Sequence, residues 1–279
     1  MENKESTNEA TFTTSHHQSY TKIKRSHDNS NSHSTHPLVE WKYLAILDYE
    51  ANCIPDVKCD PLWKDKFNFT QFQNFKSEII EIPTVVMTRE EEAVKSSTTS
   101  EVDHTHTVEY KITNEFRSFV QPTLFPNITT FCTSLTGITQ EKIETPPLGG
   151  RKFPLVFRNW LTFMSQYPQC LIVTCGDWDL RQMLPRQLTY SVVAYPTGKL
   201  LSRWCNIKVC FRELYGRKAG SMTQMLDFLN LPLEGKHHSG IDDCRNIARI
   251  VERMLRDGGE RNLEDNEIIF VTSYKSREL

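Results

Sequence analysis

The stretch WKYLAILDYEANC, residues 41–53, decides how the rest of this sequence is interpreted. Its apolar run from Tyr43 to Leu47 is short and nearly unbroken, which is typical of a buried strand. Asp48 and Glu50 follow, and because residues i and i+2 of a strand point to one face, both carboxylates are expected side by side. Such a pair is costly to bury unless a cation lies between its members, and a divalent metal ion is the usual one. On its own, however, an Asp-x-Glu pattern more often only begins a solvated loop.

The composition is that of an ordinary globular protein. The chain has 279 residues, of which 38% are hydrophobic and 24% charged, enough for one sizeable domain with extensions. No apolar segment approaches the roughly 18 to 20 residues of a membrane span, and the first residues contain no hydrophobic core of a signal peptide. We therefore expect no membrane partner, and nothing in the sequence indicates more than a monomer.

The eight cysteines are scattered and include no Cys-x-x-Cys pair, so neither a zinc site nor a disulfide framework is expected. Free thiols indicate a reducing compartment, and we expect an intracellular protein of the cytoplasm, the nucleus or both. A formal net charge of -2 gives no global indication of a polyanionic partner. Residues 181–218, with eight basic residues and one acid, form a local basic region that suits either a phosphate backbone or ordinary solvated surface.

Three segments are predicted along the chain. Residues 1–37 are rich in Ser, Thr, Asn and His and have almost nothing apolar to bury, so they are expected to be a disordered polar tail. Residues 38–258 are expected to form the folded domain, and residues 259–279 a C-terminal extension. Within the domain, residues 54–76 and 88–109 are expected to be long loops.

The apolar patterns of the domain predict an α/β fold. Residues 78–87 and 110–121 favour two further strands, which with the first would make an antiparallel start to a sheet. Helical spacing and caps then alternate with one more short apolar strand, so a mixed sheet with flanking helices is expected. The predicted later elements are helices within 131–144 with a cap at Thr139, a helix at 153–167, a strand at 170–174, a helix opening at Asp177, a helix at 221–231, and a last helix that ends at Gly258–Gly259.

Further candidate functional residues stand where strands end and helices begin, which is where chemistry lies in α/β sheets. Asp179 follows the strand at 170–174, His238 lies in a loop, and Asp243 lies near the start of the last helix. Several carboxylates from different segments suit two divalent cations, and a histidine with a near-neutral pKa suits proton transfer. With no Gly-rich phosphate loop in the sequence, this set indicates phosphodiester hydrolysis. A loop histidine is nevertheless more often a surface residue than a catalyst.

Six blocks of the sequence resemble the ERI-type exoribonucleases, which belong to the DEDDh group of 3′→5′ exonucleases. Together they cover most of residues 41–257, and the block TCGDWDL is most similar to the branch that includes the prion-interacting exonuclease of animals. The resemblance implies an RNase H-like exonuclease fold. The blocks are LDYEANC, SEIIEIPTVV, FCTSLTGIT, TCGDWDL, RWCNIK and HHSGIDDCRNIARI.

The resemblance also implies roles for individual residues. Asp48, Glu50 and Asp243 would bind one metal ion, Asp48 and Asp179 would hold the second, and His238 would be the general base. Glu50 would also help to position the attacking water. The ions would be Mg²⁺, with Mn²⁺ as a substitute.

Contacts to the substrate are implied as well. The backbone of Ala51 would touch the terminal nucleotide, and Trp178 and the turn 135–138 would flank it. Two neighbouring residues compete for each of three roles. The match after Trp178 favours Asp179 over Asp177, and the four-residue gap between base and acid favours His238 and Asp243 over His237 and Asp242.

The expected function is therefore metal-dependent 3′→5′ hydrolysis of single-stranded RNA to nucleoside 5′-monophosphates. Two alternatives stay open. The same site could cut DNA, and the protein could be a catalytically silent RNA-binding or scaffold protein.

Overall fold

A computed structural model shows a mixed sheet of six strands that includes the apolar run of residues 43–47. The structure describes residues 41–53, 76–90 and 109–260. The predicted polar tail, most of both predicted long loops and nearly all of the predicted C-terminal extension lie outside the described residues. The strands are β1 (Tyr43–Leu47), β2 (Glu50–Ala51), β3 (Ile79–Arg89), β4 (Tyr110–Phe119), β5 (Cys170–Thr174) and β6 (Trp204–Asn206).

The strand pairing confirms the predicted mixed sheet with three antiparallel N-terminal strands. β1 and β4 each pair antiparallel with β3, whereas β5 pairs parallel with both β1 and β6. β2 continues the line of β1 along β3, since Leu47 lies opposite Thr84 and Glu50 lies opposite Glu81. The sequence patterns did not predict β2 and β6, because two or three residues are too few to show alternation.

The predicted helices are present, with two corrections. The helix predicted to open at Asp177 begins as a π-helix, a form that sequence patterns do not reveal. The last helix does not end at Gly258–Gly259 but continues to Glu260, because glycine adopts helical backbone angles at modest cost. The helices are α2 (Thr130–Thr136), α3 (Gln140–Glu144), α4 (Phe153–Met164), η3 (Trp178–Met183), α5 (Leu184–Tyr190), α6 (Ile207–Tyr215), α7 (Met222–Phe228) and α8 (Gly240–Glu260).

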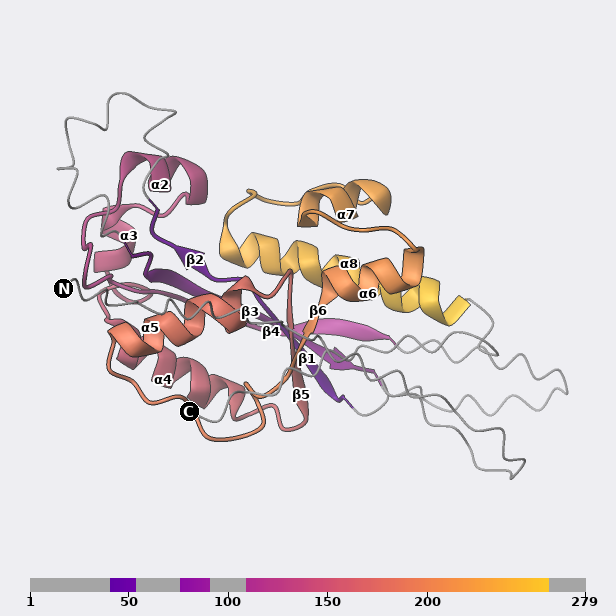
Figure 1. The fold of residues 1–279 in the computed structure, drawn as a ribbon, viewed down its shortest axis with the longest axis horizontal. Coiled ribbons are helices and arrows are strands. Elements are labelled where there is room, and N and C mark those ends of the chain that lie inside the picture. Colours follow the sequence, from indigo (N-terminus) through magenta and orange to yellow (C-terminus); the bar gives the residue numbers. More distant parts are fainter. Residues whose placement is uncertain (1–40, 54–75, 91–108, 261–279) are drawn as a thin grey trace, which may run out of the picture. The chain divides into compact units, whose positions relative to one another are not determined.

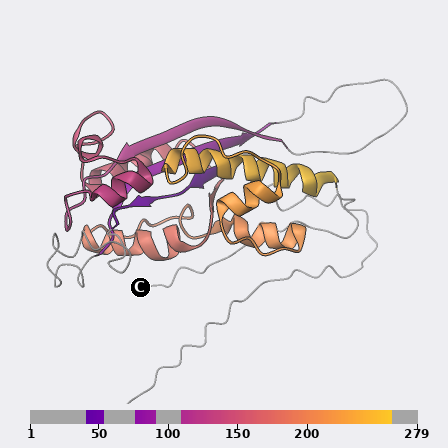
Figure 2. The ribbon, with the colours of Figure 1, turned by 90° about the horizontal axis from the view of Figure 1, so that it is seen from above.

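Helices cover both faces of the sheet, with α4 and α5 on one face and α6, α7 and α8 on the other (Figures 1 and 2). The alternation of β1 divides its side chains between these layers. Ala45 and Leu47 pack in the core cluster of α4 and α5, whereas Leu44 and Ile46 pack in the cluster of α6, α7 and α8. The even-numbered residues of this line therefore face α8, and the next of them is Asp48.

The parallel strands β1 and β5 end at the same edge of the sheet. Ile46 pairs with Val173, and β5 ends one residue later at Thr174. Beyond that point β1 has no neighbouring strand on this side, so η3 and the start of α8 can approach the chain at Asp48 and Tyr49. This carboxyl edge is where open α/β sheets bind ligands. In the described ranges, no helix is both long and apolar enough to cross a membrane.

Candidate active site

Three carboxylates are positioned by the gap between β1 and β2. Asp48 is the first residue after β1, and Glu50 begins β2 opposite Glu81. The backbone N–H of Tyr49 donates to Oδ1 of Asp179 at 2.9 Å. This hydrogen bond uses an N–H that no strand covers, and it attaches η3 to the acid pair. Asp179 is only 4% exposed.

The fourth carboxylate arrives because α8 begins very close to the sheet. A Cβ on Gly240 would lie 2.7 Å from Cγ of Pro83, 3.1 Å from the carbonyl oxygen of Asp48 and 3.2 Å from Cγ of Glu50. Only glycine allows this approach without a shift of neighbouring atoms. Asp243, one turn further along α8, is buried with side-chain exposure of 4%.

The four carboxylates are close enough to perturb one another's ionisation. Burial and then the charge of Asp48 raise the pKa of Glu50 to about 10. Burial and the charges of Asp179 and Asp243 raise the pKa of Asp48 well above its usual range. Burial raises the pKa of Asp179 to about 6, and the charge of Lys208 opposes the shifts of Asp48 and Asp179. Buried oxygen donors with this excess of negative charge fit divalent cations such as Mg²⁺ or Mn²⁺.

Both histidines of the adjacent pair lie at Asp243. The backbone N–H of His238 donates to Oδ2 of Asp243 at 2.9 Å, and Nδ1 of His237 lies 3.3 Å from Oδ1. The two rings stack with centroids 3.8 Å apart. Burial, and then the charge of His237, lower the pKa of His238. The structure therefore places His238 beside the acid cluster, and its choice over His237 stays a prediction.

The other two competing acids make contacts that differ from those of the cluster. Oδ1 of Asp177 accepts a hydrogen bond from Nε1 of Trp204 at 3.3 Å. Asp242 pairs with Arg245 at 3.1 Å and accepts the backbone N–H of Lys236 at 3.2 Å. These contacts stabilise the surroundings of the site, which is consistent with the preference for Asp179 and Asp243.

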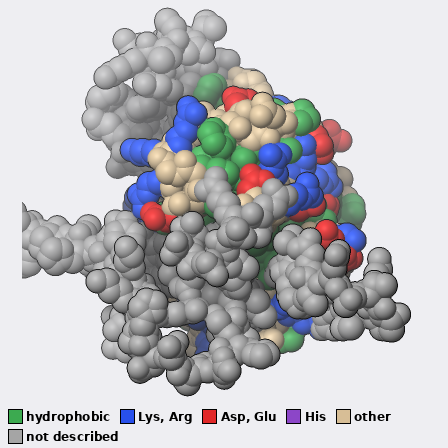
Figure 3. Space-filling view, turned by 90° about the vertical axis from the view of Figure 1, so that its right-hand side faces the viewer, with side chains coloured by type: hydrophobic (Ala, Val, Ile, Leu, Met, Phe, Trp, Pro, Cys, Tyr) green, Lys and Arg blue, Asp and Glu red, His purple; other side chains and the backbone are tan. Residues whose placement is uncertain are grey.

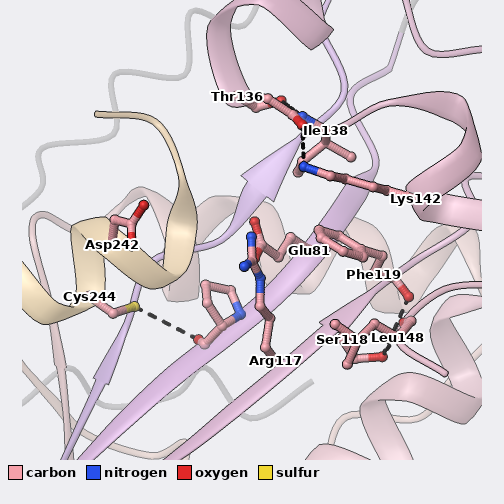
Figure 4. A network of polar contacts seen from close by, with 12 residues as sticks. Glu81, Arg117, Ser118, Phe119, Thr136, Ile138, Lys142, Leu148, Asp242 and Cys244 are labelled. Carbon is pink, nitrogen blue, oxygen red and sulfur yellow. Dashed lines mark hydrogen bonds and ion pairs between the residues drawn. The ribbon is translucent and has the colours of Figure 1, made fainter. Parts of the chain in front are cut away.

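The sequence interpretation missed one charged residue near the acids, Glu81, and included another, Lys208, only as part of the basic region 181–218. Glu81 is fully buried, and its Oε1 lies 2.6 Å from Nε of Arg117 (Figure 4). A carboxylate within the apolar run 79–87 was the available indication. Lys208 lies in the first turn of α6, and the block RWCNIK contained it without suggesting its position.

Two ammonium groups converge on the C-terminal end of α2 and the turn after it. Nζ of Lys142 donates to the carbonyl of Gly137 at 2.8 Å, and Figure 4 shows this side chain reaching back to the turn above Glu81. From residues 234–239, which we call the histidine loop, Nζ of Lys236 donates to the carbonyl of Ser134 at 3.1 Å. Among the described residues, neither lysine forms an ion pair with a carboxylate.

The predicted substrate contacts differ in exposure, and residues of the basic region make other contacts. Trp178 is 40% exposed at the start of η3, and the carbonyl of Ala51 lies 3.9 Å from Sγ of Cys132. In the basic region, Arg203 stacks on the ring of Trp41 at 4.3 Å. In the coloured part of the face seen in Figure 3, Lys and Arg side chains are interspersed with Asp and Glu, so that part is not a uniformly basic surface.

Comparison with known proteins places this geometry among nucleases. Residues 67–251 match the family described as "Exonuclease", a range that begins after Asp48 and Glu50. The human 3′-5′ exoribonuclease 1 is 30% identical over 233 residues, which are 81% of this chain and 56% of that protein. The bovine ERI1 exoribonuclease 3 is 30% identical over 226 residues, which are 80% of this chain and 56% of that protein. This chain thus spans about half the length of these curated relatives, and the equal identities leave the predicted branch a prediction.

Solved structures share the fold. The nuclease domain of 3′hExo, a DEDDh family member bound to rAMP, superposes with a TM-score of 0.61 at 30% identity, over 79% of this chain and 94% of that one. The cell-death related nuclease 4 superposes with a TM-score of 0.59 at 23% identity, over 78% and 65% of the two chains. The predicted RNase H-like exonuclease fold is confirmed.

Proposed function

This chain belongs to the exonuclease family, and we propose that it removes nucleotides from the 3′ end of single-stranded RNA as nucleoside 5′-monophosphates. The observation that carries the proposal is the meeting of three buried carboxylates, the half-buried Asp48 and an imidazole at the carboxyl edge of β1 and β5. RNA as the substrate class is supported by the names of the relatives and by the rAMP bound to a solved relative.

The carboxylates Asp48, Glu50, Asp179 and Asp243 would hold two divalent cations, Mg²⁺ with Mn²⁺ as a substitute. The raised pKa values of Asp48 and Glu50 support this assignment, because after burial the charges of neighbouring acids contribute to both rises. Bound cations would supply the charge that stabilises the attacking and leaving oxygens of the phosphodiester.

His238 would be the general base. Its lowered pKa keeps the ring neutral at neutral pH, so that a ring nitrogen can accept a proton from the attacking water. The hydrogen bond from its backbone N–H to Asp243 holds the residue beside the acids. Glu50 would help to orient the same water from the sheet side.

The substrate would be held from both sides of the four carboxylates. The backbone of Ala51 and the exposed ring of Trp178 would contact the terminal nucleotide, since aromatic rings stack well on bases. Lys236 and Lys142 would bind backbone phosphates, because each ammonium group donates to a carbonyl oxygen at the C-terminal end of α2 or the turn after it, and neither forms an ion pair with a carboxylate among the described residues.

The test uses the full chain, a 5′-labelled single-stranded RNA, a DNA of matched sequence, and Mg²⁺, Mn²⁺ or EDTA. We expect a metal-dependent ladder that shortens the RNA from its 3′ end. Asp48→Asn should lower the rate at least about 1000-fold, because a metal ligand supports several kcal/mol of charge stabilisation. The exposed Asp227 of α7 provides the control Asp227→Asn, which should keep full activity.

Three outcomes would contradict the proposal. RNA that stays intact with every metal would favour a silent RNA-binding protein. Faster cutting of the matched DNA would favour a DNA exonuclease. Undiminished cutting by a correctly folded Asp48→Asn variant would exclude the four carboxylates as the catalytic site.

The location of the protein is a separate proposal, an intracellular one in the cytoplasm, the nucleus or both. It is supported by the seven described cysteines, which are all free. Two of them, Cys205 and Cys210, share a thiol hydrogen bond with sulfur atoms 3.4 Å apart and form no disulfide. The expected monomer stays a prediction.

A further inference from the structure

His237, His238 and Asp243 form a compact group of potential metal ligands. Among the described residues, this trio has one donor atom from each side chain within 4.8 Å of the others. The scattered cysteines gave no reason to expect a zinc site, and the trio contains none of them. Two imidazoles with one carboxylate are, however, a ligand set that zinc sites use.

One distance in the trio already suits a shared ion. Nδ1 of His237 lies 3.3 Å from Oδ1 of Asp243. That is longer than the 2.7–3.2 Å of a good N–H···O hydrogen bond. Ligand atoms of a tetrahedral zinc ion, with bonds of about 2.0–2.1 Å, are about 3.4 Å apart. The separation therefore suits a long hydrogen bond and also two ligands of one ion.

The surroundings orient the carboxylate for this role. Oδ2 of Asp243 accepts the backbone N–H of His238 at 2.9 Å, which leaves Oδ1 facing the imidazole of His237. Hydrogen bonds of this kind commonly orient the ligands of metal sites. The ring of His238 lies against that of His237, with centroids 3.8 Å apart.

The trio can also contract around an ion. Both histidines are only partly buried, and the side chain of His237 is 38% exposed, so their rings have room to turn. The carboxylates of Asp48 and Glu50 lie close enough to Asp243 to interact with it electrostatically, and once ionised they would attract a divalent cation to this position. The simple alternative is that two adjacent histidines stack by packing alone, and this alternative predicts no metal affinity.

We propose that His237, His238 and Asp243 bind a transition-metal ion such as Zn²⁺, and that this ion inhibits the exonuclease. Imidazole nitrogens favour Zn²⁺ over Mg²⁺, which prefers oxygen ligands. The inhibition rests on the proposed function, because it requires that a bound ion occupy the ring of His238 and one oxygen of Asp243. The binding itself does not depend on that function.

The binding test must exclude the five histidines of the N-terminal tail, His16, His17, His27, His33 and His36. All proteins are therefore full-length chains with these five replaced by Gln, and Zn²⁺ binding is measured by calorimetry in the absence of RNA. His237→Asn is the test variant, because its amide can still donate to Asp243 but does not bind zinc well. Absorption of bound Co²⁺ reports whether thiolates take part.

We expect the parent chain to bind a zinc equivalent that His237→Asn binds at least about tenfold more weakly, with a cobalt spectrum that lacks thiolate bands. Even outer partners of metal ligands contribute that much. Equal affinity in parent and variant, or thiolate bands that persist in His237→Asn, would overturn the site. Circular dichroism checks that the variant folds, and His237→Gln repeats the comparison with a second side chain.

The inhibition test measures hydrolysis of RNA with Mg²⁺ while Zn²⁺ is added in small steps. The parent should lose activity at the zinc concentration that fills the site, and His237→Asn should need at least about tenfold more zinc. Inhibition at the same concentration in both proteins would overturn the inhibitory role. If the chain hydrolyses no RNA, the proposed function fails, and calorimetry still decides the site.

Discussion

Two regions that meet at the candidate active site are built in different ways. The edge formed by β1 and β2 is held by main-chain pairing with β3 on one side, and by β5 up to Val173 on the other. The histidine loop, residues 234–239, is held mainly by side chains. Asn246 binds both backbone groups of Glu234, and the carboxylate of Asp242 accepts the backbone N–H of Lys236.

The two regions therefore differ in how firmly they fix their side chains. Strand pairing places Asp48 and Glu50 on one face at a fixed spacing, at the expense of burying their charges. The loop is less constrained, and there two histidines contact the same carboxylate of Asp243. In the proposed function, the edge would therefore define where cations bind, and the loop would decide which imidazole serves as the base.

The largest effect that tests this comparison is expected at the loop. His238→Asn should lower the rate about 10² to 10⁴-fold, the usual contribution of a general base. Asparagine suits this position because His238 has φ 65, a left-handed backbone conformation that asparagine tolerates. The rate of His237→Asn should stay within about threefold of the parent's rate, since a residue that takes no part in the proton transfer does not supply the contribution of a general base. Single-turnover hydrolysis measures both, and a larger loss in His237→Asn would reverse the assignment.

The junction between edge and loop should show a smaller effect. Gly240→Ala would normally favour a helix, but its Cβ would meet Pro83 and the chain at Asp48. We expect a loss of about 1–3 kcal/mol in the free energy of unfolding and a rate about 10 to 100-fold lower. Urea unfolding and hydrolysis assays measure these. The control is Arg256→Ala, at the exposed far end of α8. If Gly240→Ala changed stability and rate as little as this control does, α8 would tolerate a displacement from the sheet.

The smallest effect concerns the stability of the metal-free edge. The pKa of Asp179 rises from 3.8 to about 6, so the folded state binds a proton more tightly than the unfolded state. Stability from this group is complete below about pH 4 and is lost as the pH rises through 6. Because the pKa of Glu50 rises to about 10, the decline should continue above pH 6.

In EDTA, the Tm should therefore fall between pH 5 and pH 8. Asp179→Asn should raise the Tm at pH 8 by several degrees, from a gain on the order of 2 kcal/mol. Its amide oxygen can still accept the N–H of Tyr49. The exposed Asp227→Asn should change the Tm little. Thermal unfolding followed by circular dichroism measures all three proteins, and a Tm that does not depend on pH would contradict the buried-charge account of the edge.

Much of the fold was predictable because its patterns are local. The apolar run 43–47, the strand at 170–174 and the cap at Thr139 each appear as expected, since alternation, hydrophobicity and capping depend on neighbours in the chain. β2, β6 and the π-helical turn at Trp178 were not predictable, because short pairings and helix type depend on contacts with distant segments.

The site divides in the same way. The sequence by itself determined that Asp48 and Glu50 share a face, because the two-residue period of a strand is a property of its backbone. Only the tertiary structure decided that Asp179 meets the chain at Tyr49 across 130 residues, and that Gly240 brings Asp243 to the same edge. The physical reason is that such contacts depend on where β5 ends and how closely α8 packs, and local sequence encodes neither.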